Sequence, residues 1–322
     1  MQNKTIWVTG IGGNVGQGIL RNLRNSYPDI RLIGSNVTRV SPGNFWCDEV
    51  VEMPFAWDAD FHSKCLDLVN QYQVDLIIPS TDFEVYYLSL IAEQLPKVVG
   101  CPSKEAGIFL DKMKTFDAFQ LAHIPFAQSF ETSAFDGQVQ RYLAKPKKGR
   151  GSRGLLFQPA SWKDLGAEYM IQEWAEGPEI TTAFYITKER MVHGHITMVR
   201  SLQNGTTMEC EVTDEYDHLV VPIIEKMNEH FHLVGSLNIQ SIVTPNGLVP
   251  FEINARISGT NSVRSQFGFD DVQYAVSEYL LQVDPPKVNV TKGSAVRVIM
   301  DIIYPGKTLN EISAGSTNAH IF

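Results

Sequence analysis

The first hundred residues alternate short apolar segments with segments of helical periodicity, and this alternation limits the fold more than any other feature. Apolar runs at 6–8, 31–34, 75–79 and 97–100 are separated by stretches in which apolar residues recur every three or four positions. Consecutive parallel strands need such helical crossovers, and the helices then cover both faces of the sheet. The pattern predicts an α/β domain with a Rossmann-like parallel sheet over residues 1–102.

A different pattern begins after Cys101 and predicts a second, larger domain of the α+β type over residues 103–284. Two helices are expected over 103–123, followed by short strands and by a β-hairpin over 236–256. Residues 285–322 follow a Pro-Pro break, and we expect them to form a strand-rich tail that packs on the larger domain.

The overall composition argues against several classes of protein. Apolar residues make up 43% of the 322 positions, and the formal net charge is −9. A chain this acidic is a poor ligand for nucleic acid or for an anionic membrane. No apolar run approaches the roughly 20 residues that span a bilayer, and the four cysteines are scattered without a metal-binding spacing. The first residues lack the pattern of a secretion signal, so a cytoplasmic location is the expectation.

A glycine-rich segment, Thr9 to Gly16, follows the first strand and opens the first helix. Its spacing fits the T-G-x-x-G-x-x-G pattern of dinucleotide-binding dehydrogenases, in which backbone N–H groups meet a phosphate. Such a site also needs an acidic residue after the second strand, where this chain has Ser35 and Asn36, and no Tyr here is followed by Lys at the fourth position. We therefore favour a tight strand-to-helix turn, with an NAD(P)-binding dehydrogenase or epimerase as the alternative.

A second glycine-rich segment, Lys145 to Gly154, lies between two predicted strands and carries several basic residues. Its backbone N–H groups, together with the ammonium group of Lys145, suit a polyphosphate. A solvated basic turn is the alternative at this point. No aromatic residues interleave the basic ones, so nucleic acid is not the expected partner.

The polar strand Phe251 to Arg256 is the most informative segment. Because side chains alternate along a strand, Glu252, Asn254 and Arg256 lie on one face. A carboxylate and an amide oxygen suit Mg²⁺, and an arginine suits the phosphate that the ion would bridge. A structural row of polar side chains on a solvated face is the alternative.

The hairpin turn at Asn246 and Gly247 determines which residue of the preceding strand faces Glu252. A two-residue loop would place Gln240 opposite Ile253, whereas a three-residue loop with a glycine bulge would place it opposite Glu252. We expect the bulge, because Gln240 then supplies a third oxygen ligand to the same ion.

Two acids, Glu173 and Glu179, flank a crossing between two predicted strands. An adenine could lie against the backbone of Trp174 and Ala175, with Glu179 accepting hydrogen bonds from ribose hydroxyls. Considered alone, the two acids could equally be ordinary surface residues.

Taken together and in this order, these segments resemble the ATP-grasp superfamily. The resemblance extends from Met1 to about Leu281 and is closest to the ATP-grasp portion of the carbamoyl-phosphate synthetase large chain and its short stand-alone relatives. It includes Asp111 to Thr115, and it includes Gln240, where many relatives carry an acid but the synthetase branch carries Gln. The resemblance implies an ATP-grasp domain of two subdomains, with ATP between them and a glycine-loop lid over about 125–172.

The resemblance also implies roles for the matching residues. The phosphate-binding set is Lys112, Lys145 and the lid residues Gly149, Arg150, Gly151 and Ser152. The adenosine set is Glu173, Trp174, Ala175 and Glu179. The Mg²⁺ set, which Mn²⁺ could also use, is Gln240, Glu252 and Asn254. Arg256 would face the transferred phosphoryl group, and Arg200 is our candidate for contacting the acceptor carboxylate or the γ-phosphate.

The implied activity is an ATP- and Mg²⁺-dependent ligase of the carboxylate–amine type. A small carboxylate would be activated as an acyl phosphate, which an amine or another nucleophile then attacks. A non-catalytic ATP-binding module is a further alternative. The expected partners are therefore small molecules, and a homodimer is expected only because it is the commonest assembly of soluble proteins.

Two further segments are candidates for the acceptor site. Asp82 and Glu84 follow a strand of the parallel sheet, where they could line the acceptor pocket or cap a helix. The segment Ser258 to Asn261 could offer N–H groups to an acyl phosphate.

Overall fold

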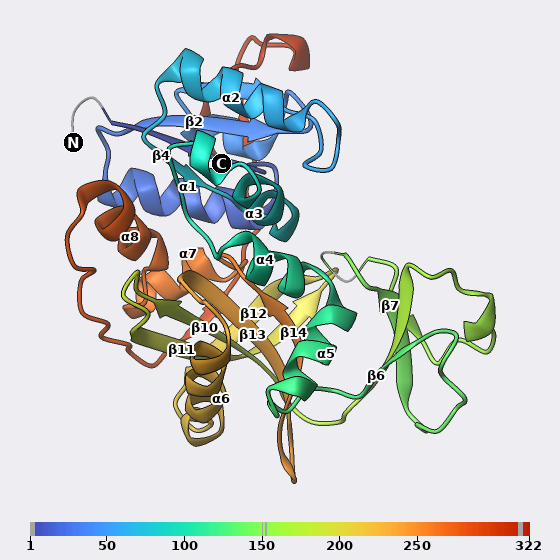
Figure 1. The fold of residues 1–322 in the computed structure, drawn as a ribbon. Helices are drawn as coiled ribbons and strands as arrows, with labels where there is room; N and C mark the ends of the chain where they lie inside the picture. Colours follow the sequence, from blue (N-terminus) through green and yellow to red (C-terminus); the bar gives the residue numbers. More distant parts are fainter. Residues whose placement is uncertain (1–3, 150, 152, 315–317) are drawn as a thin grey trace.

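The computed structural model describes residues 4–149, 151, 153–314 and 318–322, and three larger β-sheets organise them (Figure 1). The amino-terminal sheet has five parallel strands in the order β3-β2-β1-β4-β5, as the alternating pattern predicted. The strands are β1 (Thr5–Val8), β2 (Arg31–Asn36), β3 (Glu49–Glu52), β4 (Leu76–Ile78) and β5 (Lys97–Val98). Strand β3 was not predicted, because this edge strand has no fully buried residue and so carries no apolar run.

Helices cover both faces of the parallel sheet. Alternation along β1 sends Ile6 and Val8 towards α1, while Trp7 packs with residues of α2 and α3 on the opposite face. The elements here are α1 (Asn14–Ser26), η1 (Pro42–Trp46), α2 (Phe61–Tyr72), α3 (Asp82–Ser89) and η2 (Ala92–Gln94). Helix α3 ends at Ser89, and the chain then forms the separate 3₁₀ turn η2.

The largest sheet is antiparallel, with six strands in the order β14-β13-β10-β11-β12-β15. Its strands are β10 (Glu179–Ile186), β11 (Val192–Gln203), β12 (Thr206–Thr213), β13 (Gly235–Thr244), β14 (Gly247–Asn254) and β15 (Ser294–Val296). One face packs on α4 (Ser103–Leu110), α5 (Lys112–Leu121) and α6 (Asp217–His230).

The opposite face of this sheet shares one apolar core with the amino-terminal domain. Tyr185 and Met198 of the large sheet belong to the same buried cluster as Ile19 of α1 and Val8 of β1. Three short elements lie in this layer: α7 (Asn261–Arg264), α8 (Asp271–Ala275) and the π-helical η5 (Val276–Leu281). The shared core makes the two domains one packed body.

The third sheet is small and lies to one side of the large one (Figure 1). Its four strands have the order β6-β9-β7-β8, with bounds β6 (Ser129–Glu131), β7 (Tyr142–Pro146), β8 (Leu156–Phe157) and β9 (Tyr169–Glu173). It has its own small core around Phe135, Ala144 and Ile171, next to the 3₁₀ turn η3 (Trp162–Asp164). The larger domain therefore consists of two sheet-based subdomains, as expected.

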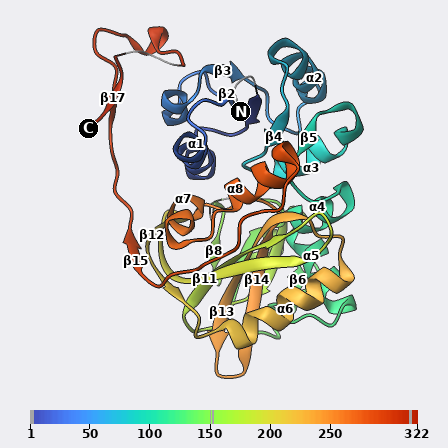
Figure 2. The ribbon, with the colours of Figure 1, turned by 90° about the vertical axis from the view of Figure 1, so that its left-hand side faces the viewer.

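The carboxyl-terminal tail does not stay on the larger domain, which corrects the prediction that residues 285–322 pack there. Strand β15 extends the large sheet, but the chain then runs beside the amino-terminal domain (Figure 2). There Arg39 donates hydrogen bonds to the carbonyl groups of Leu309 and Asn310. The last elements are β16 (Ile302–Ile303), η6 (Leu309–Glu311) and β17 (His320–Ile321).

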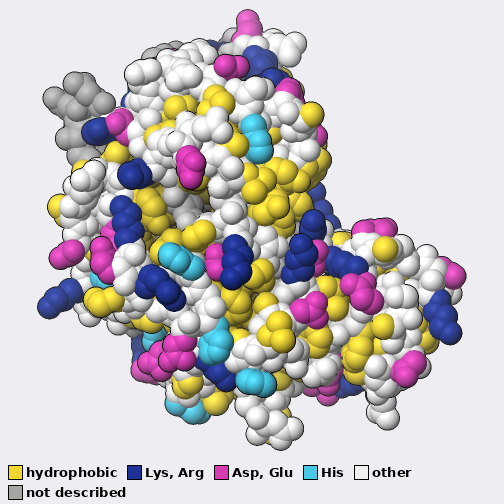
Figure 3. All heavy atoms as spheres, viewed as in Figure 1, with side chains coloured by type: hydrophobic (Ala, Val, Ile, Leu, Met, Phe, Trp, Pro, Cys, Tyr) yellow, Lys and Arg dark blue, Asp and Glu magenta, His cyan; other side chains and the backbone are white. Residues whose placement is uncertain are grey.

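On the face seen in Figure 3, basic and acidic side chains are interspersed over the domains. Within the described part of the chain, no helix combines the length and the apolar character that crossing a bilayer requires.

Candidate active site

A cavity of about 300 Å³ lies between the small sheet and the edge of the large sheet. It gathers most of the residues assigned to nucleotide and metal binding from the sequence. Its lining includes Lys112, Lys145, Gly149, Gly151, Glu173, Trp174, Ala175, Glu179, Gln240 and Glu252. Two further predicted residues, Arg150 and Ser152, lie outside the described residues. We call this space the nucleotide cavity.

Two buried lysines enter the nucleotide cavity from different elements. Lys112 is the first residue of α5, whose amino end is capped by the Asp111 carboxylate, an acceptor for the N–H groups of Met113 and Lys114. Lys145, near the end of β7, donates to Gln172 Oε1 at 2.7 Å and to the Phe251 carbonyl at 3.2 Å. Burial lowers the pKa of Lys145 to about 7, although the nearby Glu252 carboxylate opposes this shift.

The β13–β14 hairpin brings Gln240 directly opposite Glu252, which confirms the predicted pairing. The position of the bulge was predicted wrongly. Thr244 pairs with Gly247 across a two-residue turn, and the register shifts further along, between Gln240 and Ser241. A bulge inside a strand re-aims side chains next to it, and here it places the amide beside the carboxylate.

Glu252 is a negative charge surrounded by positive ones. Burial alone would raise the pKa of its carboxyl, but Lys112, Lys145, Arg256 and Arg200 together hold it below its ordinary value. The carboxylate is therefore ionised at neutral pH and able to act as an oxygen ligand. The four cations around it form a local field that suits a polyanion.

Arg200 is held by two of the other predicted site residues. Its Nε and Nη2 donate to Glu179 Oε1 at 2.9 and 2.6 Å, and Nη2 also donates to Gln240 Oε1 at 2.8 Å. Strand pairing explains the contact with Glu179, because β10 and β11 are neighbours and Ile180 pairs with Val199. The guanidinium group is thus held beside Glu179 and Gln240, which both line the nucleotide cavity.

A second cavity, of about 630 Å³, lies between the amino-terminal domain and the large sheet. We call it the acceptor cavity. Its lining includes Arg200, Arg256, Asn254 and the ends of the parallel strands around Gly10 to Gly13 and Ser80 to Glu84. Ligands of open α/β sheets bind at this carboxyl edge of the strands.

The two cavities meet at the paired residues of the hairpin. Gln240 and Glu252 line both spaces, as do Gly151, Arg153 and Leu202. Gly151 of the lid loop also lies against the β11–β12 turn, where a Cβ on Gly205 would come within 2.6 Å of its carbonyl oxygen. The lid loop therefore borders the same junction.

Arg256 joins the two domains at the acceptor cavity. Its Nε and Nη2 lie 3.0 and 2.9 Å from Asp82 Oδ2, and Nη2 donates to Asn254 Oδ1 at 2.6 Å. Two buried atoms of this group, Asp82 Oδ1 and Asn254 Nδ2, have no hydrogen-bond partner among the described residues. Buried polar atoms are rarely left unpaired, so this corner is incompletely satisfied without a ligand.

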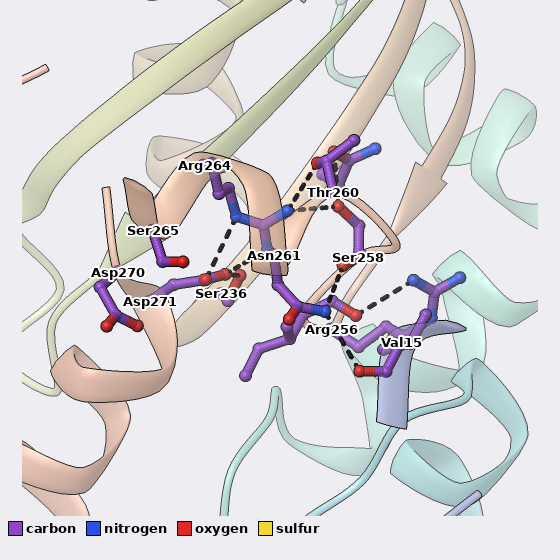
Figure 4. A network of polar contacts seen from close by, with 12 residues as sticks. Val15, Ser236, Arg256, Ser258, Thr260, Asn261, Arg264, Ser265, Asp270 and Asp271 are labelled. Carbon is purple, nitrogen blue, oxygen red and sulfur yellow. Dashed lines mark hydrogen bonds and ion pairs between the residues drawn. The ribbon is translucent and has the colours of Figure 1, made fainter. Parts of the chain in front are cut away.

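A buried polar network supports the loop that follows Arg256 (Figure 4). Arg264 and Asp271 form an ion pair with no exposed side-chain surface, and Arg264 Nη1 donates to Ser258 and Thr260, each at 2.8 Å. Asn261 Nδ2 donates to the carbonyl of Val15, which ties the loop to α1. This network is not predictable from the sequence, because an Arg and an Asp seven residues apart carry no recognisable motif.

The backbone N–H groups of the amino-terminal glycine loop donate hydrogen bonds to acceptors within the protein. Ile11 N donates to the Ser35 carbonyl at 3.1 Å, Gly12 N to Asn36 Oδ1 at 3.4 Å, and Gly13 N to the Gly10 carbonyl at 3.1 Å. This agrees with a tight strand-to-helix turn rather than a dinucleotide cradle. Glu84 lines the acceptor cavity and also belongs to the capping box of α3, in which Thr81 is the N-cap residue.

Comparisons with known proteins agree with this architecture. Residues 109–260 match the family described as the ATP-grasp domain. The chain is similar to N5-carboxyaminoimidazole synthetase from Staphylococcus aureus complexed with ADP, with a TM-score of 0.75 and 11% identity over 94% of this chain and 83% of that one. It is also similar to phosphoribosylglycinamide synthetase from Anaerococcus prevotii, with a TM-score of 0.67 and 16% identity over 95% of this chain and 85% of that one.

A third similar structure is the biotin carboxylase domain of the 2-oxoglutarate carboxylase from Hydrogenobacter thermophilus. Its TM-score is 0.66, with 15% identity over 91% of this chain and 74% of that one. No curated protein matches the chain in sequence. The family match covers residues 109–260, and the similar structures share the fold of nearly the whole chain.

Proposed function

We propose that this protein is an ATP- and Mg²⁺-dependent ligase that activates a small carboxylate as an acyl phosphate and joins it to an amine or another nucleophile. The observation that carries the proposal is the meeting of the two cavities at Gln240 and Glu252. A nucleotide in one cavity and an acceptor in the other would present their reacting ends at this pair. The similar structures, named as synthetases and a carboxylase, support the same class of reaction.

The nucleotide cavity has the groups that ATP requires. Glu173, Ala175 and the backbone of Trp174 border the part assigned to adenosine, and Lys112 and Lys145 border the part assigned to the phosphates. The lid glycines Gly149 and Gly151 line the same space, as a closing loop should. Two lysines and oriented backbone N–H groups are a suitable environment for a polyphosphate.

The three predicted metal ligands fit Mg²⁺ in number and kind. Glu252 supplies one ionised carboxylate, and Gln240 and Asn254 supply amide oxygens from the same hairpin. Mg²⁺ is commonly held by one or two carboxylates together with substrate phosphates. When bound, the ion would supply charge neutralisation at the phosphates. Mn²⁺ could occupy the same oxygen ligands.

The proposed reaction consists of two displacements. A carboxylate oxygen of the acceptor bonds to the γ-phosphorus of ATP. The bond between that phosphorus and the oxygen bridging it to the β-phosphorus breaks at the same time, which releases ADP. The nucleophile then bonds to the acyl carbon as inorganic phosphate leaves, and an amine nucleophile loses a proton. Arg256 and Arg200 would hold the acceptor carboxylate and the charge that develops on the transferred group.

The two alternative functions are less well supported. A dinucleotide-dependent enzyme would use the amino-terminal glycine loop, whose N–H groups at positions 11 to 13 already have acceptors within the protein. A non-catalytic ATP-binding module would have no use for the incompletely satisfied corner at Asp82 and Asn254 in the neighbouring cavity.

The test is ADP release from Mg-ATP across a panel of small carboxylates and amino acids, each offered with ammonia or an amine. We expect one class of acceptor to stimulate ADP release well above the acceptor-free rate. Thermal stabilisation by NAD(P) but not by Mg-ATP would contradict the proposal, and so would tight ATP binding with no stimulation by any acceptor. The proposal includes a homodimer, which light scattering would test.

A further inference from the structure

The acceptor cavity has two chemically different sides. Among the described residues, the arginines that line it are Arg153, Arg200 and Arg256, and all belong to the larger domain. The opposite side, which we call the amino-terminal wall, consists of the lining residues between Gly10 and Glu84 and includes no Lys, Arg or His. Its only charged members are Asp82 and Glu84. Positive charge is therefore confined to the end of the cavity next to the nucleotide.

An aromatic surface occupies part of the amino-terminal wall. Phe55 and Trp57 stack with their ring centroids 4.7 Å apart and their planes at 5°, and Trp57 meets the edge of Phe83 at 4.8 Å. All three side chains line the acceptor cavity, together with Met53 and Phe61. Despite this packing, Phe55 remains 38% exposed and Trp57 46% exposed. Clustered apolar side chains left open to a cavity mark a binding surface for an apolar group.

A phosphate group on the acceptor would be poorly matched to this wall. The glycine-loop N–H groups at positions 11 to 13 are already used within the protein. The amino end of α1 also lies there, but a single helix terminus attracts an anion only weakly. Asp82 in the same wall is already paired with Arg256, and the wall itself has no cationic side chain to offset a phosphate dianion.

From these features we infer that the acceptor is an unphosphorylated carboxylate with an aromatic or bulky apolar group, which packs against Phe55 and Trp57. Its carboxylate faces Arg256 and Arg200 at the junction with the nucleotide cavity. This inference rests on the proposed function for its reacting end. The two ends of the cavity thus specify an amphipathic small molecule, because each end suits one half of it and not the other.

The test is isothermal titration of the full chain, saturated with Mg-ADP, with two matched pairs of probes. L-phenylalanine against glycine isolates the apolar group, and O-phospho-L-serine against L-serine isolates the phosphate. We expect L-phenylalanine to bind at least about tenfold more tightly than glycine, and O-phospho-L-serine to bind no more tightly than L-serine. A reversal of either order would overturn the inference.

Variants then locate the binding surface. Trp57→Ala should weaken L-phenylalanine binding about tenfold while leaving ADP affinity unchanged, and Trp57→Phe should restore most of the loss. Met191→Ala is the matched control, because this side chain is 66% exposed and lines neither cavity. Unchanged L-phenylalanine binding in both Trp57 variants would overturn the inference.

ADP release with the same probes separates this inference from the proposed function. If L-phenylalanine binds in a Trp57-dependent way but no acceptor stimulates ADP release, the ligase proposal fails and the binding surface stands. If O-phospho-L-serine stimulates ADP release in both wild type and Trp57→Ala, the ligase proposal stands and the inference fails.

Discussion

The nucleotide cavity and the acceptor cavity share an edge but are built in different ways. The nucleotide cavity is lined by strands and loops of one domain, and its charged groups are contributed by segments recognisable in the sequence. The acceptor cavity is closed by two domains, and its central contact joins Asp82 to Arg256, 174 positions apart in the chain. One site is thus formed within one domain, and the other depends on how the two domains pack.

Because of this difference, nucleotide binding and acceptor specificity depend on different parts of the molecule. A nucleotide is the same molecule in every ATP-dependent enzyme, so a cavity made by one stable hairpin and one lid suffices for it. The acceptor cavity takes one wall from the amino-terminal domain, and changes in that wall can alter the acceptor without disturbing the nucleotide groups. Variants that affect only one cavity therefore test whether nucleotide binding and acceptor binding can be changed separately.

The largest effect is expected from breaking the buried ion pair beneath the acceptor cavity. Arg264→Leu should lower the free energy of unfolding by about 3–5 kcal/mol, because it leaves the Asp271 carboxylate buried without its partner. Urea denaturation measures the change. Lys292→Leu, which removes an ion pair whose side chains are 69% and 64% exposed, should cost no more than about 1 kcal/mol. Equal losses in the two variants would contradict the structural role of the network.

The next largest effect should come from the junction of the two cavities. Glu252→Gln should reduce ADP release by about 10²–10³-fold, because the metal site loses its only carboxylate. ADP affinity measured in EDTA should not weaken, since a negative charge has been removed from beside the phosphates. Glu211→Gln, an exposed acid in the same large sheet, is the control. Retention of wild-type ADP release by Glu252→Gln would exclude the metal assignment.

A change at Asp82 should affect the acceptor cavity alone. Asp82→Asn weakens the charge-assisted contact that holds Arg256, so ADP release should fall about tenfold while ADP affinity stays within about twofold. Steady-state kinetics and titration with ADP together give both values. Asp67→Asn, an exposed position on α2, is the matched control. A parallel loss of ADP affinity would mean that the two cavities are not separable as described.

The smallest effect concerns pH and the nucleotide cavity alone. Because burial places the pKa of Lys145 at about 7, the free protein loses this positive charge as the pH rises from 6 to 8. The ADP phosphates bind better to the protonated form of Lys145, so ADP binding is accompanied by uptake of a proton. ADP affinity in EDTA should therefore be about tenfold weaker at pH 8 than at pH 6. Lys145→Gln should flatten the profile. An affinity that rises with pH in the wild type would refute this account of Lys145.

Several features were predictable because a local pattern determines them. Alternation along Phe251 to Arg256 places the polar side chains on one face. The pairing of Gln240 with Glu252 was predicted from a bulge at the turn, whereas the bulge lies inside the hairpin. The parallel sheet followed from the strand–helix alternation. The short strands β3 and β6 were missed, because edge strands of three or four residues carry too little apolar pattern.

Other features depended on contacts between distant segments. The bulge lies inside the hairpin rather than at its turn, and the tail leaves the large sheet after β15 to contact Arg39. The Phe55–Trp57 stack became a binding surface only when the domains enclosed a cavity in front of it.

The resemblance to a known family indicated the full set of residues that surround the nucleotide cavity. The sequence pattern by itself determined the parallel amino-terminal sheet and the polar hairpin. These follow from the spacing of neighbouring residues, because the period of a strand or helix sets which side chains share a face. Only the tertiary structure decided the acceptor cavity, the Asp82–Arg256 contact and the network around Arg264. Each joins segments whose relative position depends on packing of a core shared by two domains, and no local spacing encodes that position.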